Sequence, residues 1–146
     1  MGSSCSGNIN ASDCFGTDSH PKIVYVKGNS TSDTSSEYTA LDISGNSSGT
    51  GILIIENGSV DITGTFTWHG PIIVTGNNVK LRYHGGGNQT IFGSVVVNEL
   101  VANGTTNLEA DISGNASMYY STQALNNVMN NLGGRRLMSM YSWQEQ

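Results

Sequence analysis

The sequence contains few positively charged residues and no long apolar run. Lys and Arg number 6 against 11 Asp and Glu in 146 residues, which gives a net charge of −5. This balance offers no basic footprint for nucleic acid. The longest apolar runs, Gly51–Ile55 and Pro71–Val74, fall far short of the ~18 residues that a membrane-spanning helix requires. We therefore expect neither a nucleic-acid interface nor a transmembrane helix in this chain.

Motifs for the common catalytic and metal chemistries are also missing. The three histidines, His20, His69 and His84, lack the spacing of a zinc site, and no cysteine lies near His69 or His84. There is no Gly-x-Ser-x-Gly elbow for acyl transfer. The triplet Gly85–Gly87 is not followed by the Lys-Ser/Thr pair of a phosphate-binding loop. We expect a protein that is not an enzyme and that has no metal and no cofactor.

Glycine, asparagine and hydroxyl residues dominate what is present. The chain has 19 Gly, 16 Asn and 32 Ser plus Thr, a profile typical of a turn-rich all-β protein that works outside the cell. The apolar fraction of 36% is enough to form a core, which excludes a disordered chain. The length fits one domain.

Two cysteines lie close together near the N-terminus. Cys5 and Cys14 have eight residues between them and form no CxxC pair. We predict a local disulfide in an exported protein, which would stabilise the fold by roughly 2–3 kcal/mol. The alternative is two free thiols in a mobile segment. Residues 1–20 are expected to form a flexible N-terminal segment tied by this disulfide, and residues 21–146 a single domain.

Two series of short apolar segments repeat along the chain. Leu41–Gly45 matches Val60–Gly64 after 19 residues, the next step lands on Val79–Arg82, and the motif returns at Asp111–Gly114. The second series consists of Gly51–Ile55, Gly70–Val74 after 19 residues, and Gly93–Val97 after 23. The repeats predict an all-β fold, a short β-solenoid with coils of 19–23 residues. A β-sandwich of hairpins remains the alternative.

The C-terminal part has the pattern of a helix. Ser121 or Thr122 can cap a helix over about 121–132, and Gly133 and Gly134 end it. Alternating residues then predict a final strand over about 136–143. We expect the helix to cap the end of the stack.

Two sets of residues are candidates for a site. Trp68 and Tyr83 could stack on sugar rings, although plain packing is the competing interpretation. Asp42, Asp61 and Asp111 fall at equivalent repeat positions, where a row of carboxylates could hold calcium or cleave glycosides. The competing interpretation is that each Asp is the polar member of an alternating strand, and it leaves no catalytic or metal site.

Six segments, taken in order, carry a resemblance to a known family: Gly51–Gly58, Thr65–Gly76, Gly85–Gly93, Gly114–Ser121, Ala124–Asn127 and Tyr141–Glu145. Together they resemble the C-terminal β-rich region of PilX-like minor pilins, the type IV pilus assembly proteins of bacteria. The resemblance covers roughly Lys22 to Gln146, although Ser142–Gln144 departs from the Trp-Arg expected there.

The resemblance implies a non-enzymatic subunit at the bacterial cell surface that acts in pilus assembly, adhesion or surface presentation. Its partners would be other pilus or surface subunits, with surface glycans as a further option. Because binding usually sits on loops held by a rigid stack, we expect its functional surface on the solenoid flank and the exposed loops, especially Ser30–Ser36 and Gly85–Thr90. Contact with a membrane is expected only through an N-terminal helix that this chain does not contain. The alternatives are a carbohydrate-binding or carbohydrate-cleaving solenoid module and a structural solenoid that assembles through its end strands.

Overall fold

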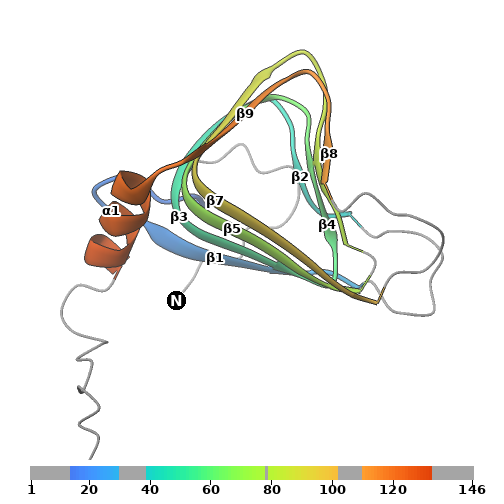
Figure 1. Ribbon diagram of the computed structural model, residues 1–146, viewed down its shortest axis with the longest axis horizontal. Coiled ribbons are helices and arrows are strands. Elements are labelled where there is room, and N and C mark those ends of the chain that lie inside the picture. The colour runs from blue at the N-terminus through green and yellow to red at the C-terminus, as the bar shows by residue number, and fades with distance from the viewer. Residues whose placement is uncertain (1–13, 30–38, 78, 102–109, 133–146) are drawn as a thin grey trace, which may run out of the picture.

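The chain winds into a β-solenoid. The structure, a computed structural model, describes residues 14–29, 39–77, 79–101 and 110–132. Viewed down the stack, each coil follows the sides of a triangle (Figure 1). All seven strand pairings in the described residues are parallel, whereas hairpins would pair antiparallel. The solenoid prediction is confirmed and the β-sandwich is excluded.

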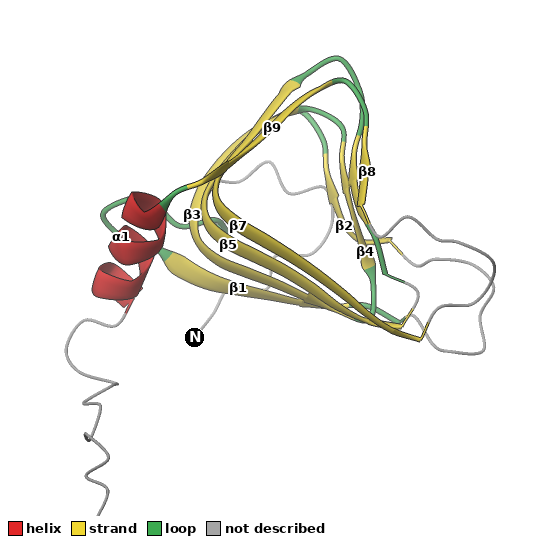
Figure 2. Ribbon diagram, viewed as in Figure 1, coloured by secondary structure: helices red, strands yellow, loops and turns green. Residues whose placement is uncertain are grey.

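The strands alternate between two parallel sheets, so that each coil adds one strand to each sheet (Figure 2). The five-stranded sheet contains, in spatial order, β1 (Lys22–Lys27), β3 (Asn46–Glu56), β5 (Thr65–Asn77), β7 (Asn88–Val101) and β9 (Asn115–Tyr120). The four-stranded sheet contains β2 (Thr39–Ile43), β4 (Ser59–Ile62), β6 (Leu81–Tyr83) and β8 (Ala110–Ile112).

Glycine shapes the corner at which the long strands β3, β5 and β7 bend. Gly70 has a φ of +131°, and a Cβ there would lie 2.1 Å from the carbonyl oxygen of Gly51 on the neighbouring coil. No side chain fits this position, and L-residues rarely adopt this conformation. Gly51 and Gly93 occupy the same corner on the adjacent coils, with φ of +147° and +155°. The bend lets one sheet form two sides of the triangle.

The core lies inside the triangle because alternate side chains of every strand point inward. In the five-stranded sheet, Leu53 pairs with Ile72 and Ile72 with Val95, as the 19- and 23-residue steps predict. In the four-stranded sheet, the inward ladder Ile43, Ile62 and Tyr83 is almost fully buried. Each fully buried aliphatic side chain contributes about 1.5–3 kcal/mol.

An aromatic cluster joins the N-terminal segment to this core. The ring of Phe15, which is 1% exposed, lies edge-on to Trp68 at 5.4 Å between ring centroids and to Phe66 at 6.2 Å. Cys14 also packs against the core. The predicted domain boundary at residue 21 thus leaves out two residues that pack with the core, Cys14 and Phe15, and the flexibility of the segment stays a prediction. The predicted disulfide stays a prediction, since Cys5 lies outside the described residues.

The predicted helix, α1 (Thr122–Leu132), is confirmed, but its position is not the expected one. Figure 1 shows α1 outside the triangle, beside the glycine corner, and not over the end of the stack. Its buried residue, Val128, packs against this corner, since a Cβ on Gly70 would lie 3.0 Å from Val128 Cγ2. The helix thus covers a flank of the solenoid. The predicted final strand at 136–143 lies outside the described residues.

Candidate functional site

A cleft of about 750 Å³ lies between α1 and the outer surface of the solenoid. We call it the α1 cleft. Its floor is made by Asp18, which precedes β1, by His69 on β5 and by Phe92 on β7. Its wall is the first two turns of α1 and the residue before it, with side chains that are nearly all polar and uncharged: Ser121, Thr122, Gln123, Ala124, Asn126, Asn127 and Asn130. The volume falls within the range of sites for small ligands.

The floor residues come together because three neighbouring strands place equivalent positions side by side. Thr50, His69 and Phe92 follow one another across β3, β5 and β7, and all three point away from the core. The ring of Phe92 lies edge-on to His69 at 5.2 Å and parallel to Tyr119 of β9 at 5.5 Å between centroids. The outer surface thus carries an aromatic row that leads out of the cleft.

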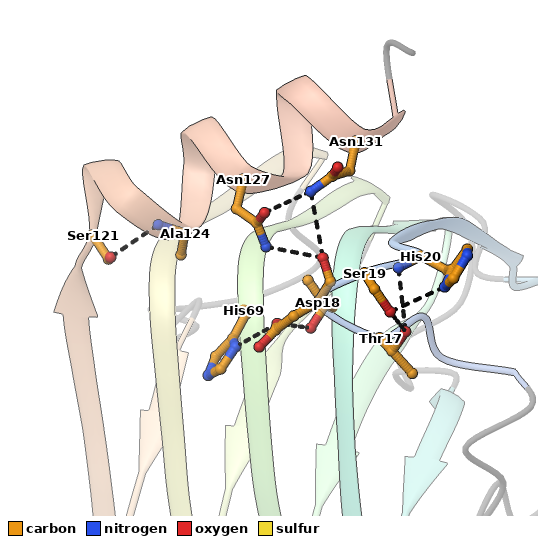
Figure 3. Close-up of polar contacts among 10 residues, drawn as sticks. Thr17, Asp18, Ser19, His20, His69, Ser121, Ala124, Asn127 and Asn131 are labelled. Carbon is orange, nitrogen blue, oxygen red and sulfur yellow. Dashed lines mark hydrogen bonds and ion pairs between the residues drawn. The ribbon is translucent and has the colours of Figure 1, made fainter.

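Asp18 is the hub of the polar contacts in the floor (Figure 3). The Thr50 hydroxyl donates to Asp18 Oδ1 at 2.6 Å, and His69 Nδ1 lies 2.9 Å from the same oxygen. These contacts, the Thr50 hydrogen bond first and that of His69 second, lower the pKa of the Asp18 carboxyl below its ordinary value of 3.8. The carboxylate is therefore ionised at neutral pH and His69 Nδ1 carries the donated proton.

Two asparagines tie α1 to the same residue. Asn127 Nδ2 donates to the main-chain oxygen of Asp18 at 3.2 Å, and Asn131 Nδ2 donates to it at 3.4 Å (Figure 3). Asn131 also donates to Asn127 Oδ1 at 2.6 Å. At the other end of the helix, Ser121 Oγ accepts from the main-chain nitrogen of Ala124 at 3.1 Å as an N-cap. These hydrogen bonds hold the wall of the cleft, α1, in a fixed position relative to its floor.

The arrangement is suited to binding and lacks the geometry of the common hydrolases. In a nucleophile–His–Asp triad the imidazole lies between acid and nucleophile, whereas here Thr50 and His69 both contact one oxygen of Asp18. Glycoside hydrolysis needs two carboxylates. Among the described residues that line the cleft, Asp18 is the single acid.

Trp68 and Tyr83 are not available for ligand stacking. They are 0% and 1% exposed, because both point inward, and the neighbouring His69 and His84 take the outward positions. The stacking interpretation is corrected in favour of packing. Burial raises the pKa of the Tyr83 hydroxyl, and this oxygen has no hydrogen-bond partner within the described part of the chain.

The row of aspartates is interrupted by an arginine. Asp42 pairs with Asp61, Asp61 with Arg82, and Arg82 with Asp111. The step from β4 to β6 is 21 residues and not 19, because the corner after β5 contains two more residues than the corner after β3. Arg82 separates Asp111 from the adjacent Asp42 and Asp61, so the three acids do not form a continuous row. No group of three or more metal-ligating side chains occurs within the described ranges.

Of the two predicted binding loops, one is among the described residues, and none of its residues lines the α1 cleft. Ser30–Ser36 is outside the described residues, and Gly85–Thr90 spans the turn into β7 and that strand's first residues. No motif in the sequence marks Asp18, Phe92, Asn126 or Asn130 as site residues. The 19- and 23-residue steps that align the corner glycines also lead from Thr50 to His69 and on to Phe92, so the floor could have been found by that route.

Comparison with known proteins adds no relative. The chain matches no family model, and no curated protein or solved structure is significantly similar to it. Within the residues that the structure describes, no helix has both the length and the apolar character needed to cross a membrane.

Proposed function

We propose that this chain is a non-enzymatic extracellular subunit associated with type IV pili, and that it acts in adhesion or surface presentation through the α1 cleft. The observation that carries the binding role is the cleft itself. Polar side chains from a rigid stack and from α1 line one concave surface, and hydrogen bonds from α1 to Asp18 keep that surface in shape. Pre-formed sites of this kind are typical of ligand recognition.

The link to pili is supported by the ordered resemblance to PilX-like minor pilins. The segments that carry it include Thr65–Gly76, the bent strand whose His69 forms part of the cleft floor. A β-rich domain displayed beyond a filament core would present such a flank to the surroundings. Bacterial cell-surface localisation is part of the same proposal.

Fractionation of pili tests the association. In bacteria that carry the native gene, we expect the protein in the sheared pilus fraction, and we expect it to leave that fraction when the major pilin gene is deleted. Asn130→Ala, a change in the cleft, should leave fractionation unaltered, since assembly does not depend on ligand binding. Protein that is found in the medium or cell bodies regardless of pili would contradict the proposal.

A second candidate, self-assembly through the end of the stack, is favoured by a specific observation. At the C-terminal end, Ile112 of β8 and Met118 of β9 continue inward ladders but are 49% and 39% exposed. In the sheet order of the described residues, β8 and β9 are edge strands. Open edges and uncovered apolar ladders are templates for pairing with another copy.

Sedimentation velocity over a wide concentration range tests this candidate. Assembly predicts a mass that rises with concentration and that returns to the monomer value in Met118→Lys. Tyr25→Lys, on an exposed ring of β1 away from the C-terminal end, serves as the control. A monomer at every concentration would exclude end-to-end assembly.

A further inference from the structure

Three amide side chains in the α1 cleft have unused hydrogen-bonding groups. Gln123, Asn126 and Asn130 line the cleft, and none has a side-chain hydrogen-bond partner among the described residues, unlike Asn127 and Asn131. Each amide offers two N–H donors and one carbonyl acceptor. Asn126 and Asn130 are four residues apart and lie on one face of α1. Such amides match a ligand whose hydroxyls both donate and accept.

His69 adds an acceptor on the floor of the cleft, opposite α1. Its Nδ1 is occupied by Asp18, and in the tautomer that donates from Nδ1 the other ring nitrogen, Nε2, is the acceptor; this atom has no hydrogen-bond partner among the described residues. His69 is held in place by Asp18 and by the edge-on ring of Phe92. The cleft therefore has hydrogen-bonding groups both on its floor and on the wall that α1 forms.

The aromatic row provides an apolar surface next to these polar groups. One face of Tyr119 lies against Phe92, with an angle of 17° between the rings. Tyr119 belongs to β9, the last strand in the sheet order, so no described strand covers its other face, and the residue is 55% exposed. An exposed ring with a polar tip gives apolar contact area together with a hydrogen-bonding group.

The charge of the lining narrows the ligand class. Among the described residues that line the cleft there is no Lys or Arg, and their single acid, Asp18, already accepts two hydrogen bonds. An anionic ligand such as a phosphate or a sialylated sugar would find no countercharge and would face the carboxylate. A neutral ligand with many hydroxyls and an apolar ring face meets no such penalty.

We propose that the α1 cleft binds a neutral carbohydrate, with Gln123, Asn126, Asn130 and His69 Nε2 contacting its hydroxyls and the Phe92–Tyr119 row contacting a sugar ring. This inference rests on the proposed binding role of the cleft and does not depend on the association with pili. The residues proposed to contact the sugar are not Trp68, Tyr83 or the row of aspartates, which were the carbohydrate candidates in the sequence.

Titration of the isolated chain with defined sugars tests the inference. The probes are neutral oligosaccharides of glucose, galactose, mannose and N-acetylglucosamine, with sialyllactose as the anionic comparison, followed by calorimetry and by ligand-observed NMR. We expect at least one neutral probe to bind with a Kd of about 1 mM or tighter and sialyllactose not to bind.

Variants then locate the site. Loss of one ligand hydrogen bond in Asn130→Ala, or of the exposed ring in Tyr119→Ala, should weaken binding by about threefold to tenfold. Tyr25→Ala is the matched control, because Tyr25 is also 55% exposed but lies on β1, outside the cleft. Circular dichroism verifies that each variant folds, and Asn130→Ala, which changes an exposed residue, remains informative if Tyr119→Ala does not fold.

Three results would overturn the inference. They are no binding of any neutral probe at 10-fold above the expected Kd, stronger binding of sialyllactose than of its neutral counterpart, and a loss of affinity in Tyr25→Ala equal to that in Tyr119→Ala. Because pilus fractionation is measured on cells, its failure together with sugar binding in solution would separate the two proposals.

Discussion

At the residue scale, the fold depends on positions where a side chain is impossible. At the corner glycines the neighbouring coil comes so close that a Cβ would lie about 2 Å from a main-chain oxygen, 1.8 Å at Gly51 and 2.2 Å at Gly93. This approach allows both α1 and the next coil to pack tightly against the bend. The corner is therefore a requirement of the stack and also the place where Val128 of α1 packs.

Replacement of Gly70 by alanine should destabilise the protein severely. The new Cβ would clash with the Gly51 oxygen at 2.1 Å and would hold a φ of +131° that costs an L-residue about 1–3 kcal/mol. With the clash included, we expect the free energy of unfolding to fall by about 2 kcal/mol or more in urea titrations. Gly86→Ala is the matched control, since nothing lies within 4 Å of its Cβ position, and it should change stability by about 0.5 kcal/mol or less. Equal effects of the two changes would contradict this account.

Tyr83→Phe should be neutral or stabilising. The hydroxyl is buried and has no hydrogen-bond partner among the described residues, so folding removes it from water without compensation. Its removal is expected to leave the free energy of unfolding unchanged or to raise it by about 1–2 kcal/mol, measured by urea titration at pH 7. A loss of more than about 1 kcal/mol would mean that the hydroxyl bonds a group outside the described residues.

At the element scale, α1 acts as a strap along the flank of the solenoid. It follows β9, its residue Val128 packs at the corner formed by β5, and its last turns reach Asp18 before β1. The helix therefore joins the last described coil to the first. Without it the cleft would lose the wall that faces His69 and Phe92.

The sequence predicted the elements better than their placement. The 19- and 23-residue steps aligned Gly51, Gly70 and Gly93 correctly because these glycines occupy one corner on successive coils. The step failed at Val79, which was set against Val60, because two additional residues at the next corner shift the register to Leu81. A period alone does not reveal an insertion at a corner.

The site was less accessible to sequence reasoning for a physical reason. The amphipathic pattern of α1 predicts an apolar face but not the surface that receives it, which is a glycine corner without apolar side chains. Asn127 and Asn131 donate to a main-chain oxygen more than 100 residues away, that of Asp18. Every residue has a main-chain oxygen, so a hydrogen bond to that oxygen does not depend on the partner's residue type and cannot be predicted from it.

Acidification should weaken the hydrogen bonds that Thr50 and His69 make with the Asp18 carboxylate. The pKa of Asp18 is lowered in the folded protein, so its ionisation contributes stability that is present above the unfolded pKa and is lost as the pH falls through the lower folded value. We expect the difference in Tm between the wild type and Asp18→Asn to be largest near pH 7 and to shrink below about pH 4. Thermal melts from pH 7 to pH 2.5 measure it. The effect is modest because Asp18 is exposed.

Thr50→Val provides the second half of this test. It removes the hydroxyl, which is the principal cause of the lowered pKa, and keeps a side chain of similar shape. The difference in Tm between the wild type and Thr50→Val should show the same dependence on pH. A Tm difference that stays constant from pH 7 to pH 2.5 in both variants would contradict a role for Asp18 ionisation.

At the scale of the whole molecule, the solenoid is a one-dimensional stack with unequal ends. At the N-terminal end Phe15, Val24 and Leu41 are buried, with exposures of 1%, 8% and 2%, whereas at the C-terminal end Ile112 is 49% exposed. In stacked repeats each unit is stabilised mainly by its neighbours. Stability should therefore decline from the central coils toward β8 and β9.

A matched pair of isoleucines measures this decline. Ile72 on β5 is 0% exposed between two neighbouring strands, and Ile72→Ala should reduce the free energy of unfolding by about 2–5 kcal/mol. Ile112 has a neighbouring strand on one side within the described residues, so Ile112→Ala should cost about 1 kcal/mol or less. Amide hydrogen exchange should show the same order, with slow exchange in β3 and β5 and faster exchange in β8. Equal protection of β8 and β5 would mean that the C-terminal end is covered in solution. A second copy of the chain would then be the first occupant to test. If self-assembly covers the end, the protection of β8 should rise with protein concentration, whereas that of β5 should not.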